Sequence, residues 1–160
     1  MKGFTLIEIL IYSAILAIVL GGIFMIFYSI MTTSESLKYQ IELTQNTKFL
    51  EQKLRWALTG AEEITMPAIG SVSSPILWIN KPGVANPLVF DLDNGVVRIA
   101  SGSDTPIPLT NSFVNVSTIS FETFSFSDDT GSTVRIRAEL ENLYKIAPAT
   151  TSLDLFISTQ

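Results

Sequence analysis

Hydrophobic residues are concentrated near the start of the chain. Residues 9–31 are almost all apolar and contain no charged side chain. This run exceeds the ~20 apolar residues with which a helix crosses a bilayer core. It is also longer than the apolar core of a secretory signal peptide, and no clear small-residue cleavage site follows it. The pattern therefore predicts a transmembrane helix, with an ordinary signal anchor as the alternative.

The next segment, residues 32–64, predicts a continuation of the same helix in amphipathic form. The apolar positions at three- and four-residue spacing are Leu37, Ile41, Leu50, Leu54, Ala57, Ala61 and Ile64. We expect this stripe to pack on a sheet, and we expect Gly60 and Pro67 to bracket the end of the helix.

Beyond residue 67 the pattern changes to loops and short alternating segments. The predicted strands are residues 76–79, 88–92, 96–100, 114–126, 134–140 and 150–158. Asp93-Asn94-Gly95 predicts a tight hairpin turn, because Asn-Gly tolerates positive φ. A slip in the alternation suggests a bulge at Thr123. One long helix packed on a mainly antiparallel sheet makes an α+β domain.

The composition excludes several kinds of chemistry. The 160 residues are 47% hydrophobic and 16% charged, with a net charge of −5, no cysteine and no histidine. Disulfides, thiol nucleophiles, zinc–thiolate sites and histidine bases are therefore absent. The acidic balance argues against nucleic-acid binding over the whole surface. Outside the apolar run the composition is close to that of an ordinary globular domain.

Glu8 is unusual because a carboxylate beside an apolar helix is costly at membrane depth. It ends the sequence Lys-Gly-Phe-Thr-Leu-Ile-Glu at residues 2–8. This sequence closely resembles the processing site of type IV prepilins and pseudopilins. The resemblance implies that a prepilin peptidase cleaves between Gly3 and Phe4, that the Phe4 amine is N-methylated, and that Glu8 becomes the fifth mature residue.

The proposed processing also has a physical rationale. N-methylation keeps the positive charge of the Phe4 amine. When apolar helices bundle, that amine and the carboxylate of Glu8 both enter a low-dielectric region. Pairing between neighbouring subunits relieves both desolvation penalties, so we expect Glu8 to set the register of assembly. Snorkelling of Glu8 to the lipid headgroups is the alternative.

Two further features bear on the kind of pilin-like subunit. Many major pilins have a proline near the middle of this helix and a pair of cysteines near the C-terminus; this chain has neither. In addition, residues 116–140 and the last strand resemble the C-terminal region of J-type minor pseudopilins and W-type minor pilins. Together these features favour a minor subunit.

Other candidate chemistry is explained more simply by turns. Asp91 and Asp93 are weak calcium candidates, but the sequence around them lacks the oxygen ligand and glycine of an EF-hand loop. Residues 129–132 spell Asp-Thr-Gly-Ser, as in aspartic proteases, but only one copy is present. We therefore expect no catalytic residue, no metal and no cofactor.

These observations predict a leader at residues 1–3, a transmembrane and filament-core helix at 4–31, and an extracytoplasmic domain at 32–160. The predicted function is a structural subunit of a type IV pilus or type II secretion pseudopilus. The implied partners are other pilin-like subunits, the prepilin peptidase and methyltransferase, the inner-membrane assembly platform and membrane lipid; no nucleic acid is expected. A membrane-anchored binding module or enzyme with an uncleaved helix is the alternative.

Overall fold

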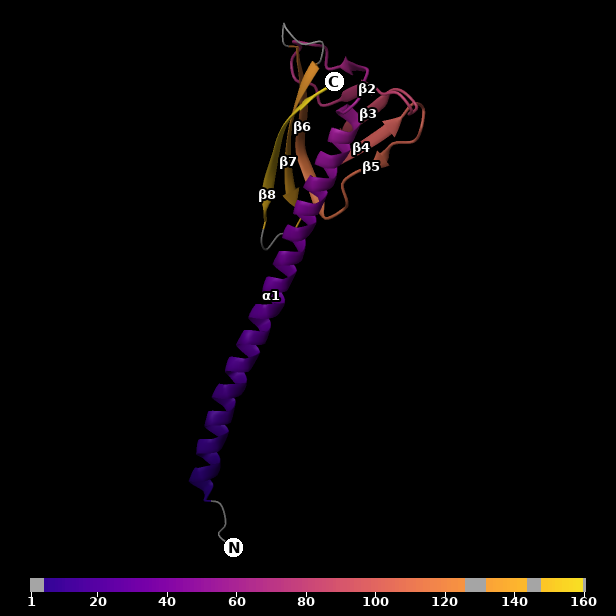
Figure 1. Ribbon diagram of the computed structural model, residues 1–160. Helices are drawn as coiled ribbons and strands as arrows, with labels where there is room; N and C mark the ends of the chain where they lie inside the picture. Colours follow the sequence, from indigo (N-terminus) through magenta and orange to yellow (C-terminus); the bar gives the residue numbers. More distant parts are fainter. Residues whose placement is uncertain (1–4, 126–131, 144–147, 160) are drawn as a thin grey trace. The chain divides into compact units, whose positions relative to one another are not determined.

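A computed structural model describes residues 5–125, 132–143 and 148–159 of the chain. It divides into two compact units, Met1–Lys38 and Tyr39–Gln160. The helix α1, Leu6–Leu58, contributes to both units (Figure 1). The α+β class predicted from the sequence, with one long N-terminal helix and antiparallel strands, is confirmed.

In the first unit the side chains of the helix are exposed almost throughout. An 18-residue window of α1 has a mean hydropathy of 2.7, and none of that window is buried by the described parts of the chain. The hydroxyls of Ser13, Thr32 and Thr33 donate hydrogen bonds to carbonyls three or four residues earlier in the helix. Polar groups satisfied in this way are compatible with a lipid environment.

The second unit contains two antiparallel sheets. The strands are β1 (Glu63–Met66), β2 (Leu77–Asn80), β3 (Leu88–Asp93), β4 (Val96–Ser101), β5 (Ile107–Pro108), β6 (Val114–Ser125), β7 (Ser132–Asn142) and β8 (Thr150–Ser158). The first sheet has the order β1-β2-β3-β4-β5 and the second β6-β7-β8. The sequence predicted one mainly antiparallel sheet, whereas the described residues form two antiparallel sheets.

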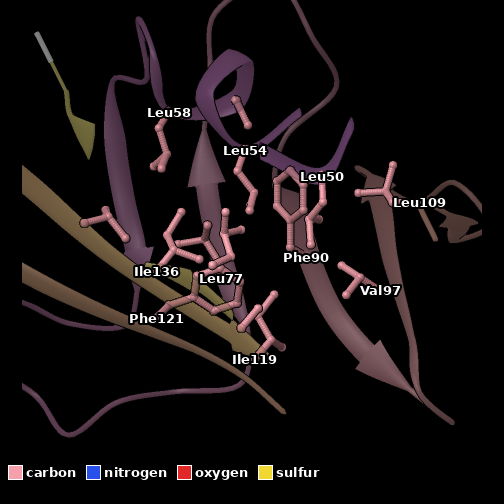
Figure 2. Packing of buried hydrophobic residues seen from close by; sticks show 14 of the residues in the cluster. Leu50, Leu54, Leu58, Leu77, Phe90, Val97, Leu109, Ile119, Phe121 and Ile136 are labelled. Atoms are coloured by element: carbon pink, nitrogen blue, oxygen red, sulfur yellow. The ribbon is translucent and has the colours of Figure 1, made fainter. Parts of the chain in front are cut away.

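The core of the second unit lies between the later part of α1 and the two sheets (Figure 2). Leu50, Leu54 and Leu58 from the helix are fully buried, as are Phe90 and Phe121 from the sheets. This arrangement confirms that the apolar stripe of the helix packs on sheet residues. The stripe begins later than expected, because Leu37 and Ile41 are exposed and Leu43 is the first buried leucine.

The helix also ends earlier than residue 64. Gly60 adopts a φ of 71°, a left-handed conformation that ends helices, and residues Glu63–Met66 form strand β1. Ala61 and Ile64 continue the apolar spacing of the helix, and Ile64 instead packs against the core from the strand. The spacing therefore predicted correctly that Ile64 packs against the core, but it placed this residue in the helix, whereas it lies in a strand.

A loop before β6 is fixed to the helix by Asn111. Its backbone N–H donates to Oδ1 of the buried Asn46 over 2.9 Å, and its side-chain amide donates to the carboxylate of Glu42 over 2.8 Å. The first of these bonds satisfies a polar group that would otherwise be buried without a partner.

The bulge predicted at Thr123 is not observed. Thr123 pairs with Val134 in an uninterrupted register, and its side chain faces the core. The register instead shifts between Val116 and Thr118, where Ser117 is the extra residue. The error arose because Phe124 was assigned to the core, whereas it is on the exposed side of β6.

Candidate functional site

The candidate site is the first turn of α1, where Glu8 follows Thr5 by three residues. The backbone N–H and the hydroxyl of Thr5 both donate to Oε2 of Glu8, each over 3.4 Å. The backbone N–H groups of Glu8 and Ile9 donate in turn to the carbonyl of Thr5. Thr5 thus lies just before the helix and Glu8 reaches back to it, as the acidic residue of a capping box does.

The surroundings of Glu8 explain why its carboxylate is tolerated at the start of an apolar helix. The positive end of the helix dipole favours an acidic residue in the first turn. The neighbouring side chains of Leu6, Ile7 and Ile9 are exposed hydrophobic groups. Within the described residues Glu8 is therefore satisfied by its own helix, while the surface around it is apolar.

Gly3 and Phe4, the predicted cleavage and methylation positions, lie outside the described residues. Glu8 is the one residue of the predicted site whose surroundings are defined. The contribution of Thr5 was missed from the sequence, although the signal was present: Thr5-Leu6-Ile7-Glu8 has the spacing of a capping box immediately before an apolar run.

Asp91 and Asp93, the weak calcium candidates, lie at the end of β3, directly before a tight hairpin turn. A hairpin turn is the interpretation that the sequence favoured. Asn94 and Gly95 have φ values of 49° and 77°, which are the positive angles of a tight hairpin. Arg98 binds both carboxyl oxygens of Asp91 over 3.0 and 2.6 Å and one oxygen of Asp93 over 2.6 Å. This pairing raises the pKa of Arg98, with the hydrogen bond to Asp91 as the largest cause.

These two carboxylates therefore converge on an arginine. Among residues 5–125, 132–143 and 148–159 no group of three or more His, Asp or Glu side chains is arranged to hold a metal ion. Of the Asp-Thr-Gly-Ser sequence, residues 129–131 lie outside the described residues, and Ser132 begins β7.

Comparison with known proteins identifies the N-terminal segment. The prokaryotic N-terminal methylation motif matches residues 1–24, which include the Thr5–Glu8 turn and the first part of the apolar helix. No curated protein and no solved structure gives a significant match to the chain.

The chain is thus type IV pilin-like at its N-terminus, a resemblance that the sequence pattern had predicted. Such a motif implies processing by a prepilin peptidase and assembly with other pilin subunits. The apolar helix that follows fits anchoring in a membrane.

Proposed function

We propose that this chain is a structural subunit of a type IV pilus or a type II secretion pseudopilus. The observation that carries the proposal is the methylation motif at residues 1–24 followed by a helix whose apolar surface is not covered by the described residues of the chain. A helix that is hydrophobic on all sides needs a lipid or protein environment. Membrane lipid before assembly and neighbouring helices after assembly supply those two environments in turn.

In this proposal residues 1–3 are a leader that is removed after Gly3. Residues 4–31 first span the inner membrane, with the N-terminus in the cytoplasm, and later form the filament core. Residues 32–160 lie outside the cytoplasm. The peptidase, its methyltransferase activity and the assembly platform act on the N-terminal segment.

Glu8 has a different partner at each stage. Before assembly its carboxylate is held by Thr5 over 3.4 Å, a length typical of weak hydrogen bonds. In the filament it pairs with the methylated Phe4 amine of a neighbouring subunit. Exchanging long contacts with uncharged donors for a pair with a cationic amine favours the assembled state. Removing one partner of such a buried pair costs about 3–5 kcal/mol.

The role of a minor subunit is a finer part of the proposal. It rests on the absence of a proline in the apolar run and of any cysteine, and on the resemblance of residues 116–140 to J-type minor pseudopilins and W-type minor pilins. The alternating strand of that region is β7, whose inward residues are Val134, Ile136, Ala138 and Leu140. A structural role without catalysis belongs to the same proposal.

Mass spectrometry of the purified protein tests the function directly. We expect a mature chain that begins at N-methylated Phe4. An intact Met1 would refute processing and would favour the alternative, a binding module or enzyme held by an uncleaved anchor.

A variant of Glu8 tests the assembly step separately. Glu8→Gln keeps the size of the side chain and removes its charge. We expect normal membrane insertion and cleavage, and incorporation into sheared filaments reduced about 100-fold or more, as a loss of about 3 kcal/mol implies. Incorporation equal to that of the unmodified chain would contradict the pairing of Glu8 with an amine.

A further inference from the structure

A row of alternating aromatic and basic side chains lies at the C-terminal end of α1, with its two aromatic rings exposed and its two lysines half-buried. Phe49, Lys53 and Trp56 follow one another on one side of the helix, and Lys81, just after β2, completes the row. Nζ of Lys53 lies 5.5 Å from the ring centre of Phe49 and 5.8 Å from that of Trp56. Nζ of Lys81 lies 5.2 Å from the ring centre of Trp56. We name these four residues the basic–aromatic ladder.

The ladder is held in place by the fold. The ammonium of Lys81 donates to the backbone carbonyls of Trp56 and Thr59, and so satisfies carbonyls at the end of the helix. Nevertheless Phe49 and Trp56 remain 43% and 46% exposed. Large aromatic side chains that are fixed before binding lose little conformational entropy when a partner covers them. They are the residue type that most often dominates an interface.

The lysines of the ladder differ from the arginines of the chain in their partners. All four arginines are in ion pairs with carboxylates: Arg55 with Glu51, Arg98 with Asp91 and Asp93, Arg135 with Asp154, and Arg137 with Glu122. Within the described part of the chain, Lys53 and Lys81 have no carboxylate partner. The ladder therefore carries two ammonium groups that are not in an ion pair with a described carboxylate, on a chain whose net charge is −5.

The same unit has a hollow of the opposite charge. It has a volume of about 340 Å³ and lies where the bulge of β6 meets the end of β7 and the start of β8. Glu139, Glu141 and Ser117 line it, together with the hydroxyl-bearing residues 150–152. The described residues that line this acidic hollow include no lysine or arginine. Glu141 accepts a hydrogen bond from the amide of Asn115 over 2.6 Å, whereas Glu139 is exposed.

We infer that the basic–aromatic ladder of one copy docks against the acidic hollow of a second copy of this chain. The two surfaces have opposite charge, and they come from different elements of the unit: the end of α1 with residue 81 in one case, and β6, β7 and β8 in the other. A contact between two different surfaces is head-to-tail, and repetition of such a contact generates a helical array. The inference rests on the proposed function as a filament subunit and adds a contact outside the apolar helices. The contact requires that two copies of this chain occupy neighbouring positions in the filament.

Disulfide cross-linking in the membrane tests the contact, because the chain has no native cysteine. One full-length chain carries Lys53→Cys and a differently tagged chain carries Glu139→Cys, and the two are expressed together and mildly oxidised. We expect a cross-linked dimer that contains both tags, and no cross-linked dimer of either variant when it is expressed alone. The matched control is Lys48→Cys, an exposed lysine of the same helix that lies outside the ladder; with Glu139→Cys it should give at least about five times less product.

Charge reversal separates a specific contact from a chance collision. Co-purification of two differently tagged copies of the same variant should fall about five-fold or more with Lys53→Glu and with Glu139→Lys. A chain that carries both reversals should associate as the unmodified chain does, and Lys48→Glu should leave the association unchanged. The contact should also weaken at 1 M salt, where the Debye length is about 3 Å.

Three results would overturn the inference: no dimer with both tags, equal dimer from the Lys48→Cys control, or a disulfide-linked product whose mass shows a different protein joined at position 53. If the mature chain begins at methylated Phe4 and enters filaments in any of these cases, the proposed function stands and this contact is wrong. An intact Met1 would instead contradict the proposed function, whatever the cross-linking shows.

Discussion

Replacing Thr123 by valine should stabilise the second unit, contrary to the usual effect of a core substitution. The side chain of Thr123 is 1% exposed, and its hydroxyl has no hydrogen-bond partner among the described residues. A buried hydroxyl without a partner costs about 1–3 kcal/mol. Valine has almost the same shape, supplies a methyl group in place of the hydroxyl, and is at least as favourable in a strand.

The expected gain is about 1 kcal/mol at the lower end of that range. For a compact unit the size of residues 39–160, a gain of 1 kcal/mol raises Tm by about 4 °C. Trp56 and Trp78 are the two tryptophans of the chain, and both lie in this unit. Tryptophan fluorescence of the full chain in detergent, excited where tyrosine does not absorb, therefore reports the unfolding of this unit without interference from the apolar segment.

Two controls identify the cause. Thr118→Val changes an exposed threonine of the same strand and should shift the free energy of unfolding by less than about 0.5 kcal/mol. Thr123→Ser keeps the hydroxyl, loses the methyl group and should lower Tm. A Thr123→Val chain that melts at or below the Tm of the unmodified protein would refute the reasoning, because it would mean that the hydroxyl contributes favourable interactions.

Two other substitutions test a turn and an ion pair. Gly95→Ala should destabilise the unit by about 1–3 kcal/mol, because φ is positive there and the new Cβ would collide with the side chain of Asn115. The control is Gly83→Ala, which has a similar φ of 80° but lies in open space and should lower Tm by less. Equal losses of Tm in the two variants would contradict the predicted collision. The pKa of Asp154 is lowered chiefly by its hydrogen bond to Arg135, so the stability it contributes is present above its unfolded pKa of about 4 and is lost as the pH falls through the folded value. Asp154→Asn should therefore reduce the acid-induced fall in Tm below pH 4, and an unchanged pH profile would show that the pair contributes nothing.

Local patterns predicted the strands well where the pattern was strong. The hairpin of β3 and β4 was predicted from Asn94-Gly95, and the alternation of β7 from four inward apolar residues, and both are confirmed. The short strands β1 and β5 were missed, because two to four residues give too little alternation to be recognised. The position of the bulge was wrong, because burial of Thr123 and exposure of Phe124 reverse the usual preference of these residue types.

The candidate site was predictable to the extent that it is local in sequence. The methylation motif and Glu8 could be recognised within eight consecutive residues. The basic–aromatic ladder could not, because Lys81 is brought to Trp56 by the packing of β2 beside the end of α1. The acidic hollow likewise depends on three strands and a bulge, whose register is set by the whole sheet.

The hydrogen bond between Asn46 and Asn111 has a consequence for folding. The two residues are 65 apart in sequence, whereas the helix relies on local contacts, so we expect the helix to form before the loop that satisfies Asn46 docks. The Nδ2 of Asn46 donates to Glu42 within the helix, but a sheet that docks in a wrong register would bury Oδ1 of Asn46 without its partner, at a penalty of about 1–3 kcal/mol. Asn46 therefore favours one position of the sheets on the helix, because any other position loses its hydrogen bond to Asn111 and is less stable.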